Sequence, residues 1–183
     1  MPVSDFKASY LNLEIKEFNE RIEKLSEILE DCTLCPRACH VNRLKKQTGF
    51  CRSTDEVMVS SIGPHFGEEK ELVGRNGSGT IFLSNCNLGC LYCQNYELSH
   101  LGEGNIVSEE NLAKAMLSLQ GIGCHNINLV TPTHFIPQLV KAIKMAIELG
   151  LKLPIVYNCG GYENIETIKL LEGIIDIYMP DIK

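Results

Sequence analysis

The sequence predicts an α/β protein whose main body is a partial barrel of parallel βα units. Four short apolar runs, residues 80–85, 126–131, 153–158 and 174–179, alternate with longer amphipathic stretches, which is the pattern of strand–helix repeats. Cysteines or polar residues directly follow all four runs, as they do where a site forms at the carboxyl ends of parallel strands. Four strands would make an open half-barrel that stops near Lys183, so we expect an apparently truncated barrel.

The amino-terminal part is predicted to be a helix over residues 10–30. Its apolar residues recur at spacings of three and four and form one stripe: Leu11, Ile15, Phe18, Ile22, Leu25 and Leu29. Such a stripe favours packing against the helix's own domain, and a coiled-coil surface for a partner is the alternative.

A compact cysteine-rich piece, residues 31–52, comes next. Its four cysteines are Cys32, Cys35, Cys39 and Cys51. Four thiols with nearby Pro36 and Gly49 could close a tetrahedral site for zinc, and a second iron–sulfur cluster or free thiols are the alternatives. We therefore divide the chain into a helix with a cysteine-rich cap, residues 1–56, and the βα body, residues 57–183.

The body is predicted to begin with a strand at residues 57–62, which Gly63-Pro64 ends. Three helices are expected between its later strands, at residues 108–121, 137–149 and 162–171. Ser108 suits the N-cap of the first, Pro137 the first turn of the second, and Gly150 the C-cap that follows it.

The most specific motif is the C-x3-C-x2-C run formed by Cys86, Cys90 and Cys93 after the first parallel strand. Asn85, Asn87, Gly89 and Asn95 stand in and around it and favour a loop over a helix that buries three thiols on one face. A structural zinc site would want a fourth ligand nearby. Three thiolates on a four-iron cluster leave one iron open to a substrate or cofactor, so the motif predicts iron–sulfur chemistry.

The same run resembles the signature of the radical S-adenosylmethionine (radical SAM) enzymes. The wider sequence is similar to the branch related to pyruvate formate-lyase activating enzyme. The stretches that carry this similarity are Cys32-Thr-Leu-Cys-Pro-Arg-Ala-Cys39, Gly63-Pro-His-Phe-Gly-Glu-Glu69, Gly77-Ser-Gly-Thr80, Cys90-Leu-Tyr-Cys-Gln-Asn-Tyr96 and Asn128-Leu-Val-Thr-Pro-Thr-His134.

The resemblance implies roles for particular residues. Cys86, Cys90 and Cys93 would hold a [4Fe-4S] cluster whose fourth iron is chelated by S-adenosylmethionine. The residues implied to line the cofactor pocket are Tyr92 beside the adenine, Thr131 and His134 after the second strand, Asn158 at the third, and Asp181 and Lys183 at the fourth. Many family members carry Gly-Gly-Glu after the second strand, whereas this chain has Thr131-Pro132-Thr133-His134, so that contact is not carried over. The family fold usually has six strands.

The implied function is reductive cleavage of S-adenosylmethionine to a 5′-deoxyadenosyl radical that abstracts hydrogen. A low-potential donor such as flavodoxin or ferredoxin would supply the electron, and a glycine of a partner enzyme is the substrate that the branch suggests. Two non-catalytic alternatives remain, an electron-transfer protein and a zinc-stabilised interaction module.

Composition argues against nucleic-acid-binding, secreted and membrane-spanning proteins. The net charge is −6 and the basic residues are dispersed, which disfavours nucleic-acid binding. The sequence starts without the basic and apolar segments of a signal peptide, and no apolar run has membrane-spanning length. Nine cysteines without an export signal favour metal or redox chemistry in the cytoplasm. Cys124 and Cys159 are expected to be buried thiols.

Overall fold

The computed structural model describes residues 6–182, which form one six-stranded sheet in the order β3-β1-β2-β4-β5-β6. The strands are β1 (Val57–His65), β2 (Ser78–Leu83), β3 (Asn105–Val107), β4 (Ile127–Val130), β5 (Ile155–Cys159) and β6 (Ile177–Pro180). β2, β4, β5 and β6 run parallel to one another, whereas β1 pairs antiparallel with both β2 and β3. The four predicted parallel strands are thus confirmed, and the mixed α/β architecture is consistent with a partial barrel.

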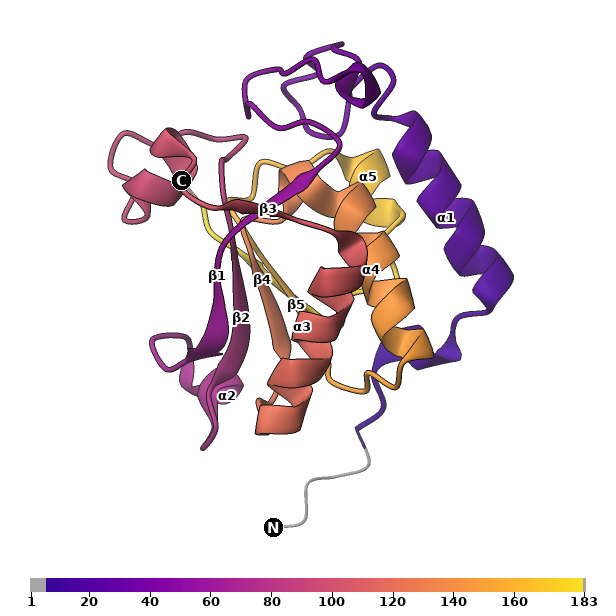
Figure 1. The fold of residues 1–183 in the computed structure, drawn as a ribbon, viewed down its shortest axis with the longest axis vertical. Helices are drawn as coiled ribbons and strands as arrows, with labels where there is room; N and C mark the ends of the chain where they lie inside the picture. Colours follow the sequence, from indigo (N-terminus) through magenta and orange to yellow (C-terminus); the bar gives the residue numbers. More distant parts are fainter. Residues whose placement is uncertain (1–5, 183) are drawn as a thin grey trace.

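The longer helices lie together on one side of the sheet (Figure 1). They are α1 (Ile15–Glu27), α3 (Glu109–Ile122), α4 (Ile136–Glu148) and α5 (Ile165–Lys169), and a short α2 (Lys70–Val73) connects β1 to β2. Ser108 caps α3 as predicted, because its hydroxyl accepts a hydrogen bond from the backbone of Asn111 at 3.3 Å. Asn164 caps α5 in the same way through Glu166 at 3.0 Å, so this helix starts later than predicted.

Several predicted boundaries were wrong. The helix expected over residues 10–30 is a 3-10 turn at Ser9–Asn12 followed by α1, and the last strand begins three residues later than expected. The short β3 was not predicted, since three residues cannot show a strand period.

Each parallel strand sends alternate side chains to the helices and to the opposite face. Ile81, Leu129 and Tyr157 are paired across neighbouring strands and belong to the buried core beneath the helices. The same core includes Phe18 and Leu25 of α1, which confirms that the amino-terminal stripe packs against the body of the protein.

The cysteine-rich cap rests on the ends of helices and strands at the top of the sheet in Figure 1. Asn164 donates to the carbonyl of Thr33, and Thr167 donates to that of Leu34, each at 2.9 Å. Gln138 of α4 donates to the carbonyl of Asp55 at 2.8 Å. These buried or half-buried bonds tie both ends of the cap to the helical layer.

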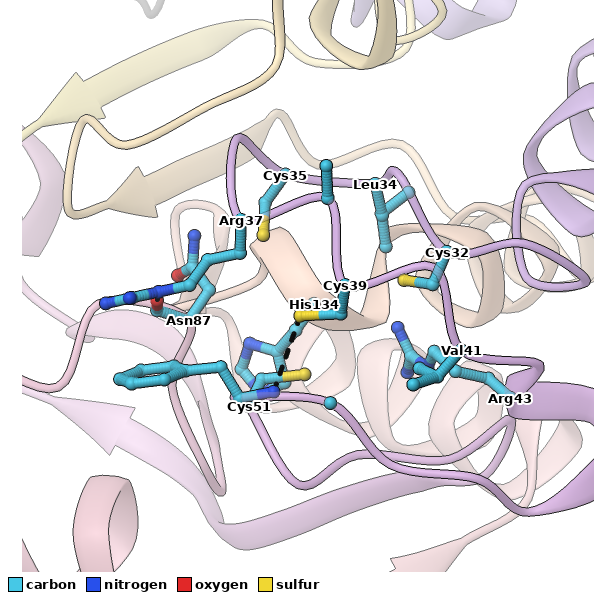
Figure 2. A pocket seen from close by; sticks show the side chains of 13 residues that line it. Cys32, Leu34, Cys35, Arg37, Cys39, Val41, Arg43, Cys51, Asn87 and His134 are labelled. Atoms are coloured by element: carbon cyan, nitrogen blue, oxygen red, sulfur yellow. Dashed lines mark hydrogen bonds between the residues drawn. The ribbon is translucent and has the colours of Figure 1, made fainter.

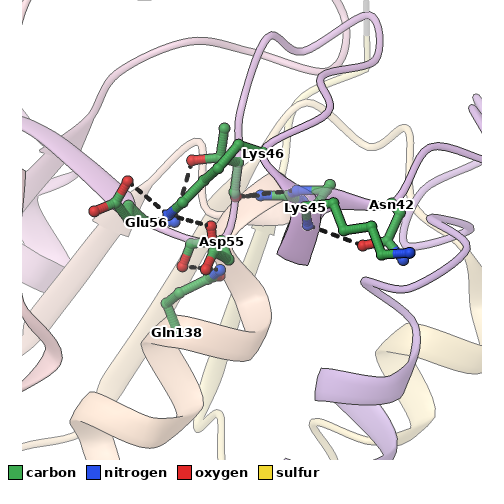
Figure 3. Close-up of polar contacts among 8 residues, drawn as sticks. Asn42, Lys45, Lys46, Asp55, Glu56 and Gln138 are labelled. Carbon is green, nitrogen blue, oxygen red and sulfur yellow. Dashed lines mark hydrogen bonds and ion pairs between the residues drawn. The ribbon is translucent and has the colours of Figure 1, made fainter.

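Polar contacts also close the cap on itself, as Figure 3 shows around Lys46. The Lys46 ammonium pairs with Asp55 at 2.7 Å and Glu56 at 2.9 Å. Surface pairs of this kind stabilise a fold by less than about 1 kcal/mol each. They fix the path of the chain in the cap more than they contribute to the free energy of unfolding. Within the described residues, no helix has the length and apolar character needed to cross a membrane.

Candidate functional site

The three cysteines of the C-x3-C-x2-C run lie in the loop that follows β2. Their loop contains two residues with left-handed backbone, Asn85 at φ 69° and Gly89 at φ 71°. The backbone amide of Leu88 donates to the Cys86 sulfur at 3.3 Å, and the Ser99 hydroxyl donates to the Cys93 sulfur at 3.1 Å. Burial raises the pKa of Cys86, and the amides directed at its sulfur act in the opposite direction. The loop is therefore shaped to present thiols to a ligand.

Two arginines of the cap hold this loop in place. Arg37 donates from Nε to the carbonyl of Asn87 at 2.8 Å and from Nη2 to that of Leu88 at 3.0 Å. Its guanidinium also lies 3.4 Å from the ring centroid of Phe50. A rigid fork that reaches two successive carbonyls is a task for which Arg is suited and Lys is not.

Arg52 holds the far side of the same loop. It donates to the carbonyl of Ser99 at 2.8 Å and also to that of His100. Because Ser99 in turn donates to the Cys93 sulfur, the cap braces the segment that carries the third cysteine.

The strand-end residues of the predicted pocket lie along one edge of the sheet. The amide of Thr131 donates to the carbonyl of Asn158 at 2.8 Å, and the amide of Asp181 donates to that of Cys159 at 2.8 Å. These bonds continue the β4–β5–β6 pairing past the ends of the strands. The structure thus brings Thr131, Asn158 and Asp181 onto the same edge as the cysteine loop. Lys183 lies outside the described residues.

The other two predicted pocket residues have different surroundings. Tyr92 is 72 % exposed, so the adenine contact that the resemblance implies stays a prediction. His134 is 2 % exposed, and its Nε2 lies 2.8 Å from the carbonyl oxygen of Ser84, at the end of β2. Burial lowers the pKa of His134 to about 3, so the ring is neutral and Nε2–H donates to that carbonyl. Its other nitrogen, Nδ1, has no hydrogen-bond partner.

The sheet face opposite the helices carries a residue that the sequence reasoning missed. Asn128 pairs with Thr80 and Val156 across the three central strands, one row below Asn158. It is fully buried, and neither atom of its side-chain amide has a hydrogen-bond partner. A buried unpaired amide costs roughly 1–3 kcal/mol, so Asn128 is a candidate to bind a polar ligand on this face.

Two glutamates were also missed, because no pattern along the sequence singles them out. Glu163 accepts hydrogen bonds from Thr133 at 2.7 Å and from Tyr157 at 2.9 Å. Glu68 accepts a longer one, at 3.4 Å, from Asn158. The Thr133–Glu163 and Asn158–Glu68 bonds join residues 30 and 90 positions apart in the chain. All three bonds place carboxylates beside the strand ends.

The four cysteines of the cap line a single small cavity. Figure 2 shows Cys32, Cys35, Cys39 and Cys51 around this space, with Arg43 and His134 among the other lining residues. The predicted grouping of the four thiols is therefore present. In residues 6–182, no three His, Cys, Asp or Glu side chains are arranged to hold a single metal ion.

The chemistry of the loop after β2 fits an iron–sulfur cluster with an open iron. It offers three sulfur ligands with amides and a hydroxyl directed at two of them, which is how proteins stabilise cluster thiolates. The unpaired side-chain amide of Asn128 provides a donor and an acceptor for a small cofactor near the edge at which Thr131 and Asp181 lie.

Comparison with known proteins agrees with this geometry. The family model described as the radical SAM superfamily matches residues 80–183. An uncharacterized protein of Methanocaldococcus jannaschii is 32 % identical over 171 residues, which are 89 % of this chain and 48 % of the relative. The chain thus spans about half the length of that relative. No solved structure shows a significant match.

Proposed function

The chain belongs to the radical SAM superfamily, and on that premise we propose that Cys86, Cys90 and Cys93 hold a [4Fe-4S] cluster which, with S-adenosylmethionine, serves hydrogen abstraction. When bound, the cluster and S-adenosylmethionine together supply a 5′-deoxyadenosyl radical. The observation that carries the proposal is the placement of the three thiols at the carboxyl edge of four parallel strands, inside the matched segment.

The protein's own residues would bind, orient and shield the cluster and S-adenosylmethionine. Arg37 and Arg52 hold the backbone on both sides of the cysteine loop, which keeps the three sulfurs in position. We infer that Asn128 and the backbone edge at Thr131 receive the polar methionyl end of S-adenosylmethionine, because an unpaired buried amide offers both a donor and an acceptor. Asn158 and Asp181 lie on the same edge and would complete the pocket.

We further propose that the substrate is a protein, a glycine of a partner enzyme, and that a flavodoxin or ferredoxin supplies the electron. The similarity to the branch related to pyruvate formate-lyase activating enzyme supports this choice. Large apolar side chains also stand exposed around the cysteine loop, where a partner protein could cover them: Leu91 at 96 %, Tyr92 at 72 % and Leu101 at 61 %.

Anaerobic reconstitution with iron and sulfide, followed by reduction in the presence of S-adenosylmethionine, tests the proposal. We expect 5′-deoxyadenosine and a paramagnetic spectrum that changes when S-adenosylmethionine is added. Alanine in place of Cys86, Cys90 and Cys93 should abolish both signals. Cys124→Ala is the matched control, because this thiol is buried away from the loop. A triple variant that keeps the S-adenosylmethionine-sensitive spectrum would refute the assignment.

A further inference from the structure

The cavity of the cap contains a buried cation with no anion to balance it. Arg43 is 1 % exposed, and its guanidinium donates from Nε to the carbonyl oxygen of Thr54 at 3.0 Å. Among the described residues no carboxylate pairs with it, and its Nη1 has no hydrogen-bond partner at all. An uncompensated buried charge costs several kcal/mol. Whatever fills this cavity should therefore carry negative charge.

A second unpaired polar atom lines the same cavity. His134 is buried, its Nε2 is engaged with the carbonyl of Ser84, and its Nδ1 has no partner. His134 comes from the turn after β4 and Arg43 from the cap, so two separate parts of the chain direct unsatisfied polar groups to one place (Figure 2). Buried polar groups are normally paired, which indicates a missing ligand between the cap and the sheet.

Backbone amides approach the sulfurs of the cap as they do in the loop after β2. The amide of Arg37 is directed at the Cys35 sulfur two residues earlier, just as Leu88 donates to Cys86. The amide of Phe50 lies 3.4 Å from the Cys39 sulfur, and the backbone of Gly49 approaches so closely that a Cβ there would lie 2.7 Å from it. Amide-to-sulfur bonds stabilise thiolate ligands and tune the potential of clusters.

The surroundings of the cap sulfurs favour a cluster over a single ion. Zinc would draw four sulfurs to about 2.3 Å from one point. In the described part of the chain no group of ligands is gathered as one ion requires. The amide-to-sulfur bonds of the cap match the one in the loop after β2, where the iron–sulfur motif lies. We propose that Cys32, Cys35, Cys39 and Cys51 bind an iron–sulfur cluster of the [4Fe-4S] type, separate from the cluster after β2, and that Arg43 balances its negative charge.

The two clusters would lie side by side. Asn87 directly follows Cys86, its carbonyl accepts a hydrogen bond from Arg37, and its side chain is hydrogen-bonded to the Cys35 thiol. One residue thus contacts ligands of both sites. All four irons of the cap cluster would have protein ligands, so its spectrum should not respond to S-adenosylmethionine, unlike that of the cluster with an open iron.

The test is metal and sulfide analysis of the full chain purified without oxygen, with its paramagnetic spectrum. We expect about eight irons and eight sulfides per chain, and about four of each in the Cys86→Ala/Cys90→Ala/Cys93→Ala variant. That variant should keep a spectrum indifferent to S-adenosylmethionine. Cys35→Ala/Cys39→Ala should retain only the responsive spectrum, and Cys124→Ala should keep both.

Arg43 is tested by a matched pair. Arg43→Met should lose at least half of the unresponsive signal, and Arg43→Lys, which keeps the positive charge, should lose less. Stoichiometric zinc in the wild type, or about four irons that all disappear with Cys86, Cys90 and Cys93, would overturn the inference. If the wild type holds only about four irons and all of them survive that triple variant, the cap cluster is supported and the proposed function is refuted, so the two failures are distinguishable.

Discussion

Replacing Arg37 with Met should weaken iron retention at Cys86, Cys90 and Cys93, although Arg37 lies outside that loop. The variant removes both donors to the carbonyls of Asn87 and Leu88 and the positive charge over Phe50. Met keeps much of the apolar stem, so packing against the ring is largely preserved. The variant therefore mainly loses the hydrogen bonds that hold the backbone between Cys86 and Cys90.

The magnitude follows from these contacts. Two hydrogen bonds at about 1 kcal/mol each and a cation–π contact of about 0.5–1 kcal/mol sum to roughly 2.5 kcal/mol. Arg37 is solvent-exposed, so about 2 kcal/mol is the better figure. This is about a 30-fold change in the equilibrium that keeps the loop ordered for its ligand.

The assay is anaerobic competition with an iron chelator, followed through the spectrum that responds to S-adenosylmethionine. The chelator concentration that removes half of this signal should fall by about 10- to 30-fold in Arg37→Met. The chelator concentration for Arg37→Lys should lie between those for Arg37→Met and the wild type, since Lys can restore only one of the two hydrogen bonds. Arg75→Met is the control, because Arg75 is an exposed residue near the amino end of β2. If Arg37→Met and Arg75→Met lose iron equally, the cap does not hold the loop.

Three further outcomes are expected. Asn128→Leu should stabilise the cofactor-free protein by about 1 kcal/mol in urea unfolding, since it removes two unpaired buried atoms. The same variant should bind S-adenosylmethionine more weakly in calorimetry. An unchanged affinity would show that Asn128 does not contact the cofactor. Tyr10→Phe should cost about 1 kcal/mol, because Tyr10 donates to the carbonyl of Leu153 at 2.7 Å. Burial raises the pKa of Tyr10 above its ordinary value near 10. The contribution of Tyr10 to stability is therefore full below about pH 10 and declines above it, and this decline should be smaller in Tyr10→Phe. Parallel curves of stability against pH for the two proteins would contradict this reasoning. Cys124 and Cys159 are buried, and burial raises the pKa of both thiols, so mass spectrometry should find them alkylated last in the native protein, and rapid modification of either would be the contrary result.

Much of the parallel sheet could be predicted from the sequence, because its signals are local. Apolar runs of strand length, a capping Ser108 and the C-x3-C-x2-C spacing each depend on residues close together in the chain. The rule that parallel strands share a carboxyl edge then placed the cysteine loop, Thr131 and Asn158 together, and the structure has them there.

Boundaries and short elements were harder. β3 has three residues and forms only because β1 offers it an antiparallel edge. Helix α5 begins at Ile165, after the Asn164 cap, and that asparagine also donates to Thr33 of the distant cap. Contacts of this kind connect segments more than a hundred residues apart, so no local pattern reveals them.

By itself, the sequence determined which runs become parallel strands, and it predicted which residues carry sulfur chemistry, since spacing and alternation are properties of the chain. Only the tertiary structure decided what surrounds them. It left the amide of Asn128 unpaired in the sheet, buried Arg43 without a carboxylate, and directed His134 toward the cap thiols. Burial and the pairing of charge depend on every neighbour a side chain meets in space, and those neighbours are brought together only when the distant segments pack.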